Sequence, residues 1–131
     1  MKYEAKIISE NPDIEEELKI KIKDIEILCF VEEYRCPVEV GKEYIIDLEA
    51  VIFDDLNIEK SSTKVKELIQ QSDSFSYSIR GIFHPSNKKI DAGIDIDLAD
   101  EDISDFWFLE NKFVVIDIDR FNVIILEKIN K

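Results

Sequence analysis

Hydrophobic and polar residues alternate over most of this 131-residue chain, and this pattern predicts β-strands rather than helices. The clearest case is residues 89–98, where every second residue is apolar and aspartates occupy most of the positions between them. Turn-forming residues such as Asn11-Pro12 and His84-Pro85 separate the alternating segments. The predicted strands are residues 2–7, 18–27, 43–53, 74–84, 89–98, 113–119 and 121–127, of which the last two could also be one bent strand.

The apolar phase slips by one residue at two places, Lys23-Asp24 and Arg80-Gly81. A slip of one residue sends every later side chain to the opposite face of a sheet. We therefore predict a β-bulge at each place, because a bulge inserts one residue and bends the strand as the corner of a barrel requires.

One segment carries helical signals instead. Residues 61–71 open with three hydroxyl side chains that can cap a helix, and Val65, Leu68 and Ile69 follow at helical spacing. A second, shorter helical turn is predicted over residues 99–109. About seven strands with one helix between the third and fourth predict an all-β, mainly antiparallel fold. We expect a small bent β-barrel or sandwich, OB-like, that forms a single domain over the whole chain.

The composition, 45% hydrophobic and 36% charged, predicts a packed core rather than a disordered acidic chain. The first residues lack the apolar stretch of a signal peptide, and no apolar run is long enough to cross a bilayer. These features predict a cytoplasmic location and no membrane partner. Cys29 and Cys36 are expected to be reduced there, and a disulfide between them is the less favoured alternative.

The negative charge is concentrated in one part of the chain. Residues 91–119 hold ten acidic residues and one basic residue, Lys112, and so carry −9 of the formal net charge of −13. The other 102 residues hold 20 acidic and 16 basic residues. Because the alternation turns Asp91, Asp95 and Asp97 outward, we expect this acid to decorate a folded face.

An acidic face of this kind favours a basic partner, through electrostatic steering and complementary charge. We therefore predict a non-enzymatic interaction module, like an immunity protein or an inhibitor, that docks a basic protein. Phe106, Trp107 and Phe108 are consecutive, so at least one should be partly exposed or close a barrel end. Core filling is the ordinary role of such a cluster, but a tryptophan beside charged residues is also a typical interface anchor. The predicted partner-binding residues are Asp91, Asp95, Asp97, Asp100, Glu101, Asp102, Asp105 and Trp107.

Two alternatives are a small-molecule or metal-binding β-barrel domain and an OB-like nucleic-acid-binding protein. Carboxylates side by side on one strand rarely converge on a cation. Cys29 and Cys36 could join the single histidine, His84, at a zinc ion, but the cysteines lack the usual zinc-ligand spacing and the sequence indicates no fourth ligand. The three glycines are isolated, which leaves no phosphate-binding loop, and a net charge of −13 makes nucleic acid an unlikely partner. We therefore predict no catalytic residue, no metal site and no cofactor, and leave the oligomeric state open.

Overall fold

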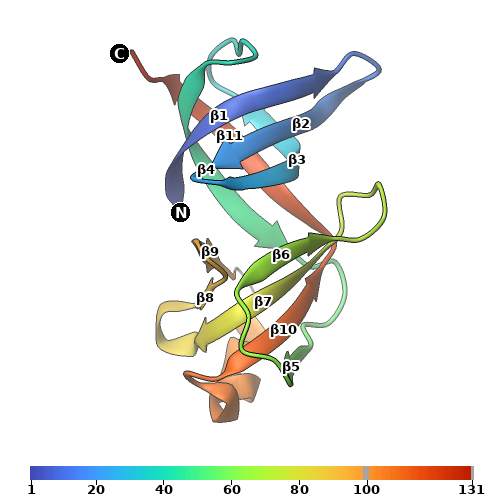
Figure 1. The fold of residues 1–131 in the computed structure, drawn as a ribbon, viewed down its shortest axis with the longest axis vertical. Coiled ribbons are helices and arrows are strands. Elements are labelled where there is room, and N and C mark those ends of the chain that lie inside the picture. Colours follow the sequence, from blue (N-terminus) through green and yellow to red (C-terminus); the bar gives the residue numbers. More distant parts are fainter. Residues whose placement is uncertain (99–100, 131) are drawn as a thin grey trace. The chain divides into compact units, whose positions relative to one another are not determined.

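The structure is a computed structural model that describes residues 1–98 and 101–130 (Figure 1). The chain divides into two compact units. We call Met1–Leu48 with Phe121–Lys131 the barrel unit and Glu49–Arg120 the sheet unit, which is therefore an insertion within the sequence of the barrel unit. Strands make up most of both units, which confirms the predicted all-β class. Whether the two units behave as the predicted single domain stays a prediction.

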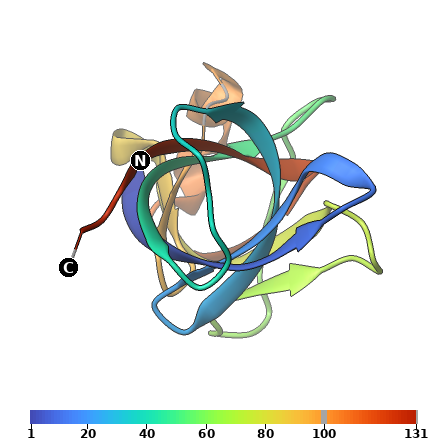
Figure 2. The ribbon, with the colours of Figure 1, turned by 90° about the horizontal axis from the view of Figure 1, so that it is seen from above.

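Five strands form the barrel: β1 (Lys2–Asn11), β2 (Ile14–Ile22), β3 (Ile25–Tyr34), β4 (Glu43–Val51) and β11 (Arg120–Lys128). They close in the order β1-β2-β3-β11-β4, and Figure 2 shows them as a ring. Strands β1, β2 and β3 are successive antiparallel neighbours, β4 returns to pair with β1, and β11 lies parallel to β3. Alternate residues of each strand are buried, including the large side chains of Tyr44 and Phe121. The alternation of the sequence therefore marks the inside of the barrel.

The bulge predicted at Lys23-Asp24 is wrong, because these two residues form the turn between two separate strands. Ile22 pairs directly with Ile25, and Lys23 has a positive φ of 54°. A two-residue turn and a bulge both shift the apolar phase by one residue. The pattern alone did not separate them, since the turn lacks the glycine that usually marks a tight hairpin.

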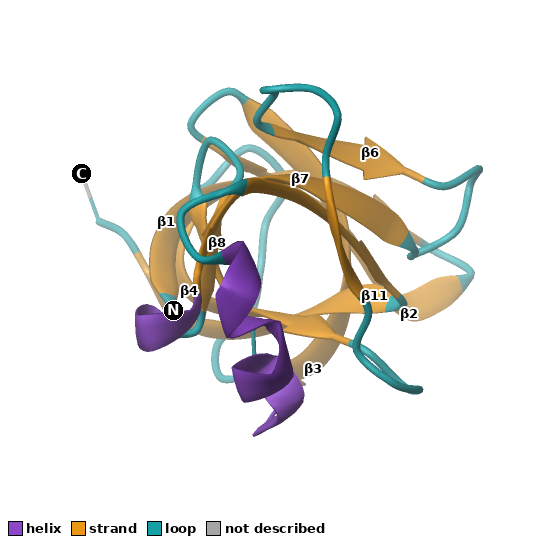
Figure 3. Ribbon diagram, turned by 90° about the horizontal axis from the view of Figure 1, so that it is seen from below, coloured by secondary structure: helices purple, strands orange, loops and turns teal. Residues whose placement is uncertain are grey.

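The sheet unit holds six strands: β5 (Ile58–Lys60), β6 (Glu67–Gln70), β7 (Tyr77–His84), β8 (Lys89–Asp91), β9 (Asp95–Asp97) and β10 (Phe113–Ile118). They form an open sheet in the order β5-β10-β7-β8-β9, and β6 also pairs with β7. The two 3₁₀ segments are η1 (Pro85–Asn87) and η2 (Glu101–Leu109), drawn in purple in Figure 3. Segment η2 confirms the helical turn predicted over residues 99–109 for its described part, Glu101–Leu109, and is kinked at Phe106; residues 99–100 lie outside the described residues.

The helix predicted over residues 61–71 is wrong. Within it, Glu67–Gln70 is strand β6, which pairs antiparallel with the first half of β7. Leu68 and Ile69 are half-buried in this strand, and Val65 is exposed. The free edge of β7 supplies backbone hydrogen bonds to this segment. These tertiary interactions override the local preference for a helix that the spacing of apolar residues indicated.

The predicted strand over residues 89–98 is a hairpin. Strands β8 and β9 pair with each other across a short turn, in which Gly93 has a φ of 99° and the Ala92 N–H donates to the Ile94 carbonyl at 3.0 Å. The alternation still gives the buried side correctly. The inward residues are Ile90, Ala92, Ile94, Ile96 and Leu98, and all five are buried.

The second predicted bulge, at Arg80-Gly81, is also wrong, because β7 pairs with β10 without a shift in register. Gly81 serves a different purpose. A Cβ atom there would collide with the backbone carbonyl oxygen of Asp91 and lie 2.6 Å from its carbon. Glycine at this position therefore lets the backbone of β8 approach β7 closely.

Candidate functional site

The β8–β9 hairpin carries three of the predicted partner-binding residues, and part of its charge is neutralised. Asp91 lies directly opposite Asp95, and Asp97 lies opposite Lys89. The carboxylate of Asp91 accepts from Lys66 Nζ at 2.7 Å and from the Gly93 N–H at 3.1 Å. The hydrogen bond from Lys66 is the main reason that the pKa of Asp91 lies below its usual value.

The other predicted contact residues lie on or beside η2. Asp105 is exposed, and the side chains of Trp107 and Phe108 are 46% and 69% exposed. This confirms that at least one of the three consecutive aromatic residues is open to solvent. Asp100 lies outside the described residues, and so do the side chains of Glu101 and Asp102.

Two further acidic residues of the 91–119 segment, Asp117 and Asp119, lie elsewhere in the sheet unit. Asp117 belongs to β10 and Asp119 follows it, and β7 separates β10 from the β8–β9 hairpin in the strand order. The acidic residues of this segment are therefore distributed over two regions of the sheet unit. The structure brings Asp117 and Asp119 together with acidic residues from a different part of the sequence.

We call this second region the acidic pocket. It is a hollow of about 260 Å³ between the segment after β4 and the end of β10. The pairing of β5 with β10, in which Glu59 lies opposite Val115, brings the two segments side by side. The pocket is lined by Ile52, Asp54, Asp55, Asn57, Glu59, Val115, Asp117 and Asp119.

Asp119 holds the walls of the acidic pocket in place. Its carboxylate accepts from the Phe53 N–H at 2.6 Å, its own N–H donates to the Val51 carbonyl at 2.9 Å, and its carbonyl accepts from Ser76 Oγ at 3.3 Å. The Phe53 ring is 63% exposed and lies 5.0 Å from the guanidinium carbon of Arg120. We therefore assign Asp119 a structural role. The other carboxylates of the pocket are the ones that could contact a ligand.

Four carboxylates of the pocket are available to a cation from outside. Asp54, Asp55, Glu59 and Asp117 are exposed, and none of them forms an ion pair with another described residue. Glu59 accepts one hydrogen bond, from Asn57 Nδ2 at 3.3 Å. Such a set of unpaired acceptors suits a guanidinium or ammonium group.

Sequence reasoning missed Asp54, Asp55 and Glu59. The acidic doublet at the end of a predicted strand was a signal, but it lies more than 50 residues before Asp117 in a chain with 30 acidic residues. Among the described residues, no group of three or more histidine, cysteine, aspartate or glutamate side chains has the geometry to hold a metal ion. Likewise, no helix in the described ranges is long and apolar enough to cross a membrane.

Comparison with known protein families gives one result. Residues 1–126 match the family described as "Uncharacterised conserved protein UCP019853". The chain belongs to this family. The matched range spans the whole sheet unit and all of the barrel unit except residues 127–131. No curated protein and no solved structure matches the chain.

Proposed function

We propose that this protein is a non-enzymatic interaction module that binds a basic partner protein through the acidic pocket. The observation that carries this proposal is the convergence of five carboxylates on one hollow, four of them without an ion pair to another described residue. Like charges held close together repel one another, and a partner's cation relieves that repulsion. The pocket therefore favours a positively charged group from outside the chain.

An arginine of the partner fits this site better than a lysine. Its planar guanidinium carries five donors and forms paired hydrogen bonds with carboxylates, whereas a lysine ammonium acts as a point charge. The exposed ring of Phe53 beside the pocket already accepts one guanidinium, that of Arg120, over its face. A partner arginine would find the same combination of carboxylate and aromatic surface.

The test is binding of a short arginine-rich peptide, measured by calorimetry at low and high salt. We expect the affinity to fall about tenfold or more between ~0.05 and ~0.3 M salt, because screening weakens exposed charge pairs. A lysine-rich peptide of the same length should bind more weakly. The variant that removes the site without changing its shape combines Asp54→Asn, Asp55→Asn, Glu59→Gln and Asp117→Asn.

A matched control separates a specific pocket from general attraction to an acidic protein. It removes the same number of negative charges, four, from exposed positions of the barrel unit and leaves the acidic pocket intact. We expect the pocket variant to lose most of the affinity and the control to lose little. Equal losses in the two variants would contradict the proposal. The control combines Asp13→Asn, Asp24→Asn, Glu26→Gln and Glu32→Gln.

We further propose that the barrel unit is OB-like and that the protein is cytoplasmic. The spatial order β4-β1-β2-β3 is that of a Greek key, and the parallel β3–β11 pair completes a five-stranded barrel. Both cysteines are free, which suits a reducing compartment.

This topology supports a second candidate function, single-stranded nucleic-acid binding, because OB-like barrels use the face of their second and third strands for it. On that face Lys19 lies opposite Leu28 and Lys21 opposite Glu26, and Glu17 lies opposite the half-buried Phe30. A gel shift at low salt tests this candidate. No retention of a single-stranded oligonucleotide would exclude it, and retention lost in the Lys19→Gln, Lys21→Gln variant would support it.

A further inference from the structure

We propose that the sheet unit contains a second site, of opposite charge, that binds the phosphate group of a small molecule with a planar ring, such as a mononucleotide. The site is a hollow of about 550 Å³ that we call the lysine pocket. This volume lies within the range of about 300–1,000 Å³ that small-molecule sites occupy. Three lysines, two serines, an asparagine and a phenylalanine line it: Lys60, Lys64, Lys112, Ser61, Ser62, Asn111 and Phe113.

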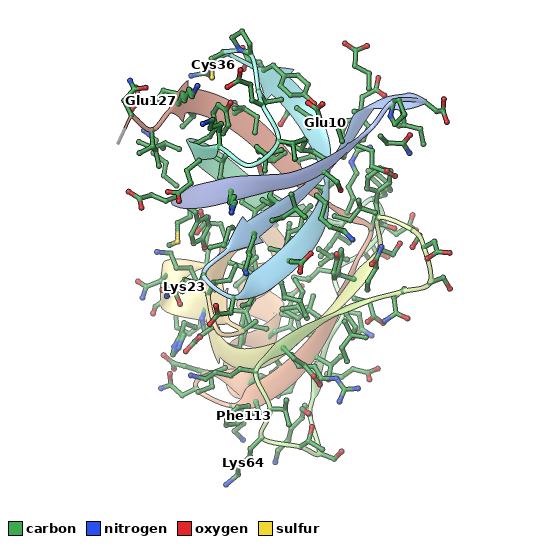
Figure 4. The ribbon with its side chains drawn as sticks, turned by 45° about the horizontal axis from the view of Figure 1, so that its top comes forward. Glu10, Lys23, Cys36, Lys64, Phe113 and Glu127 are labelled. Carbon is green, nitrogen blue, oxygen red and sulfur yellow. The ribbon has the colours of Figure 1, made fainter. Side chains whose placement is uncertain are left out.

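The backbone fixes the two segments that carry these side chains. Ser61 N–H donates to the Phe113 carbonyl at 2.8 Å, which continues the β5–β10 pairing by one bond. Lys112 lies in a tight turn, where its N–H donates to the Leu109 carbonyl at 3.1 Å and its carbonyl accepts from the Phe83 N–H at 3.0 Å. The sheet therefore sets the positions of Lys60 and Lys112, and Lys64 lies on the segment that follows β5. Figure 4 shows Lys64 and Phe113 at the same end of the unit.

The charge of the lysine pocket contrasts with that of the chain. The sequence holds 30 acidic and 17 basic residues, yet Lys60, Lys64 and Lys112 are exposed and form no ion pair with any described residue. By comparison, Lys66 and Lys128 each have a carboxylate partner. Three unpaired ammonium groups around one hollow repel one another, and an anion bound between them removes that repulsion.

The remaining lining residues indicate which anion. The hydroxyls of Ser61 and Ser62 can donate hydrogen bonds, as a phosphate with several acceptor oxygens requires. The Thr63 N–H donates to Ser61 Oγ at 3.1 Å, which orients that hydroxyl. Phe113 is half-buried at the wall and offers a ring face against which a planar base can stack. A phosphate alone would leave most of the hollow and this ring unused.

The test titrates the full chain with adenosine monophosphate and, separately, with inorganic phosphate, followed by calorimetry and by the backbone amide signals. We expect adenosine monophosphate to bind and to shift the signals of Ser61, Ser62 and Lys112. The variant that combines Lys60→Gln, Lys64→Gln and Lys112→Gln should lose about tenfold in affinity for each lysine removed. Its thermal unfolding should be unchanged, because all three positions are exposed.

The matched control removes three exposed lysines from the barrel unit, through Lys2→Gln, Lys6→Gln and Lys23→Gln, and should bind as the natural chain does. Phe113→Leu should weaken binding of adenosine monophosphate but not of inorganic phosphate. Equal binding by the two triple variants, or no binding at millimolar ligand, would overturn the proposal and leave the lysines as protection of the β5 edge. Tighter binding of a short oligonucleotide than of the mononucleotide would overturn the small-molecule assignment.

Discussion

The barrel unit and the sheet unit solve the problem of exposed strand edges differently. In the barrel unit, five long strands close on one another, and a closed barrel has no free edge. In the sheet unit, β5, β8 and β9 have only three residues each, and the connecting segments 52–57 and 61–66 are mostly exposed. Both proposed pockets use such connecting segments. Binding residues usually lie on such segments, and both proposed pockets belong to the sheet unit.

The net charges of the two units differ little, whereas the local charges of the two pockets in the sheet unit are opposite in sign. The barrel unit holds 9 basic and 14 acidic residues, a net −5, and the sheet unit holds 8 and 16, a net −8. Within the sheet unit, β10 begins at the lysine pocket and ends at the acidic pocket. Charge of each sign is thus gathered at one end of a single strand, and net charge alone does not describe the binding properties of the unit.

The largest expected effects come from the cores, and they test whether the two units unfold together. Phe121 in the barrel unit and Phe83 in the sheet unit are both fully buried. Replacing either one by alanine should cost about 3–5 kcal/mol of the free energy of unfolding. Strand β4 crosses the boundary between the units at Leu48–Glu49, so we expect each variant to destabilise both units in one cooperative transition.

One probe in each unit makes this measurement possible. Trp107, the chain's single tryptophan, reports on the sheet unit by fluorescence during denaturant unfolding. Cys29 reports on the barrel unit, since its thiol is fully buried and burial raises its pKa, so a thiol reagent reaches it only after unfolding. The Cys36→Ser variant leaves Cys29 as the single thiol. Separate transitions for the two probes would contradict a single domain.

A smaller effect distinguishes the glycines of the two units. Gly81→Ala in the sheet unit forces a Cβ atom against the backbone of Asp91, and we expect a cost of about 1–3 kcal/mol or more. Gly41→Ala in the barrel unit has free space around it, so its expected cost of about 1 kcal/mol comes only from the strain of a side chain at a φ of 89°. Chemical denaturation of both variants measures the difference. A larger loss in Gly41→Ala than in Gly81→Ala would show that close strand approach is not what position 81 requires.

The barrel unit was the more predictable from sequence, for a physical reason. Its strands alternate between buried and outward residues over most of their length. The prediction of one strand over residues 18–27 missed the turn at Lys23-Asp24 and ended early, since β3 continues to Tyr34, but its buried residues were correct. In the sheet unit, β6 carries helical spacing and becomes a strand only because an edge of β7 is free beside it. That edge is a property of the tertiary fold, which local patterns do not contain.

The difference between local patterns and tertiary pairing also explains which parts of the candidate sites were predictable from sequence. The outward position of Asp95 follows from alternation and was predictable. The acidic pocket depends on the pairing of β5 with β10, which joins Glu59 to Val115 across more than 50 residues of sequence. The lysine pocket depends on the same pair of strands. Neither pocket corresponds to a short sequence motif. Its residues are common surface residues that come together only when the sheet forms.

The smallest expected effect concerns single ion pairs, one in each unit. In the sheet unit, the pair of Lys66 with Asp91 is partly shielded, and Asp91→Asn should cost about 0.2–1 kcal/mol at pH 7. Asparagine keeps an acceptor for the Gly93 N–H, so the change reports on the charge alone. In the barrel unit, the exposed pair of Lys128 with Glu39 should contribute less.

The pH dependence of this cost identifies its source. Because the hydrogen bond from Lys66 lowers the pKa of Asp91 in the folded state, its contribution is fully present above the ordinary aspartate pKa of about 3.9. It is lost as the pH falls through the lowered pKa of the folded chain. Urea unfolding of the natural chain and of Asp91→Asn should therefore differ at pH 7 and converge in acid. A difference that stays constant down to low pH would mean that Asp91 stabilises the hairpin through its shape rather than its charge.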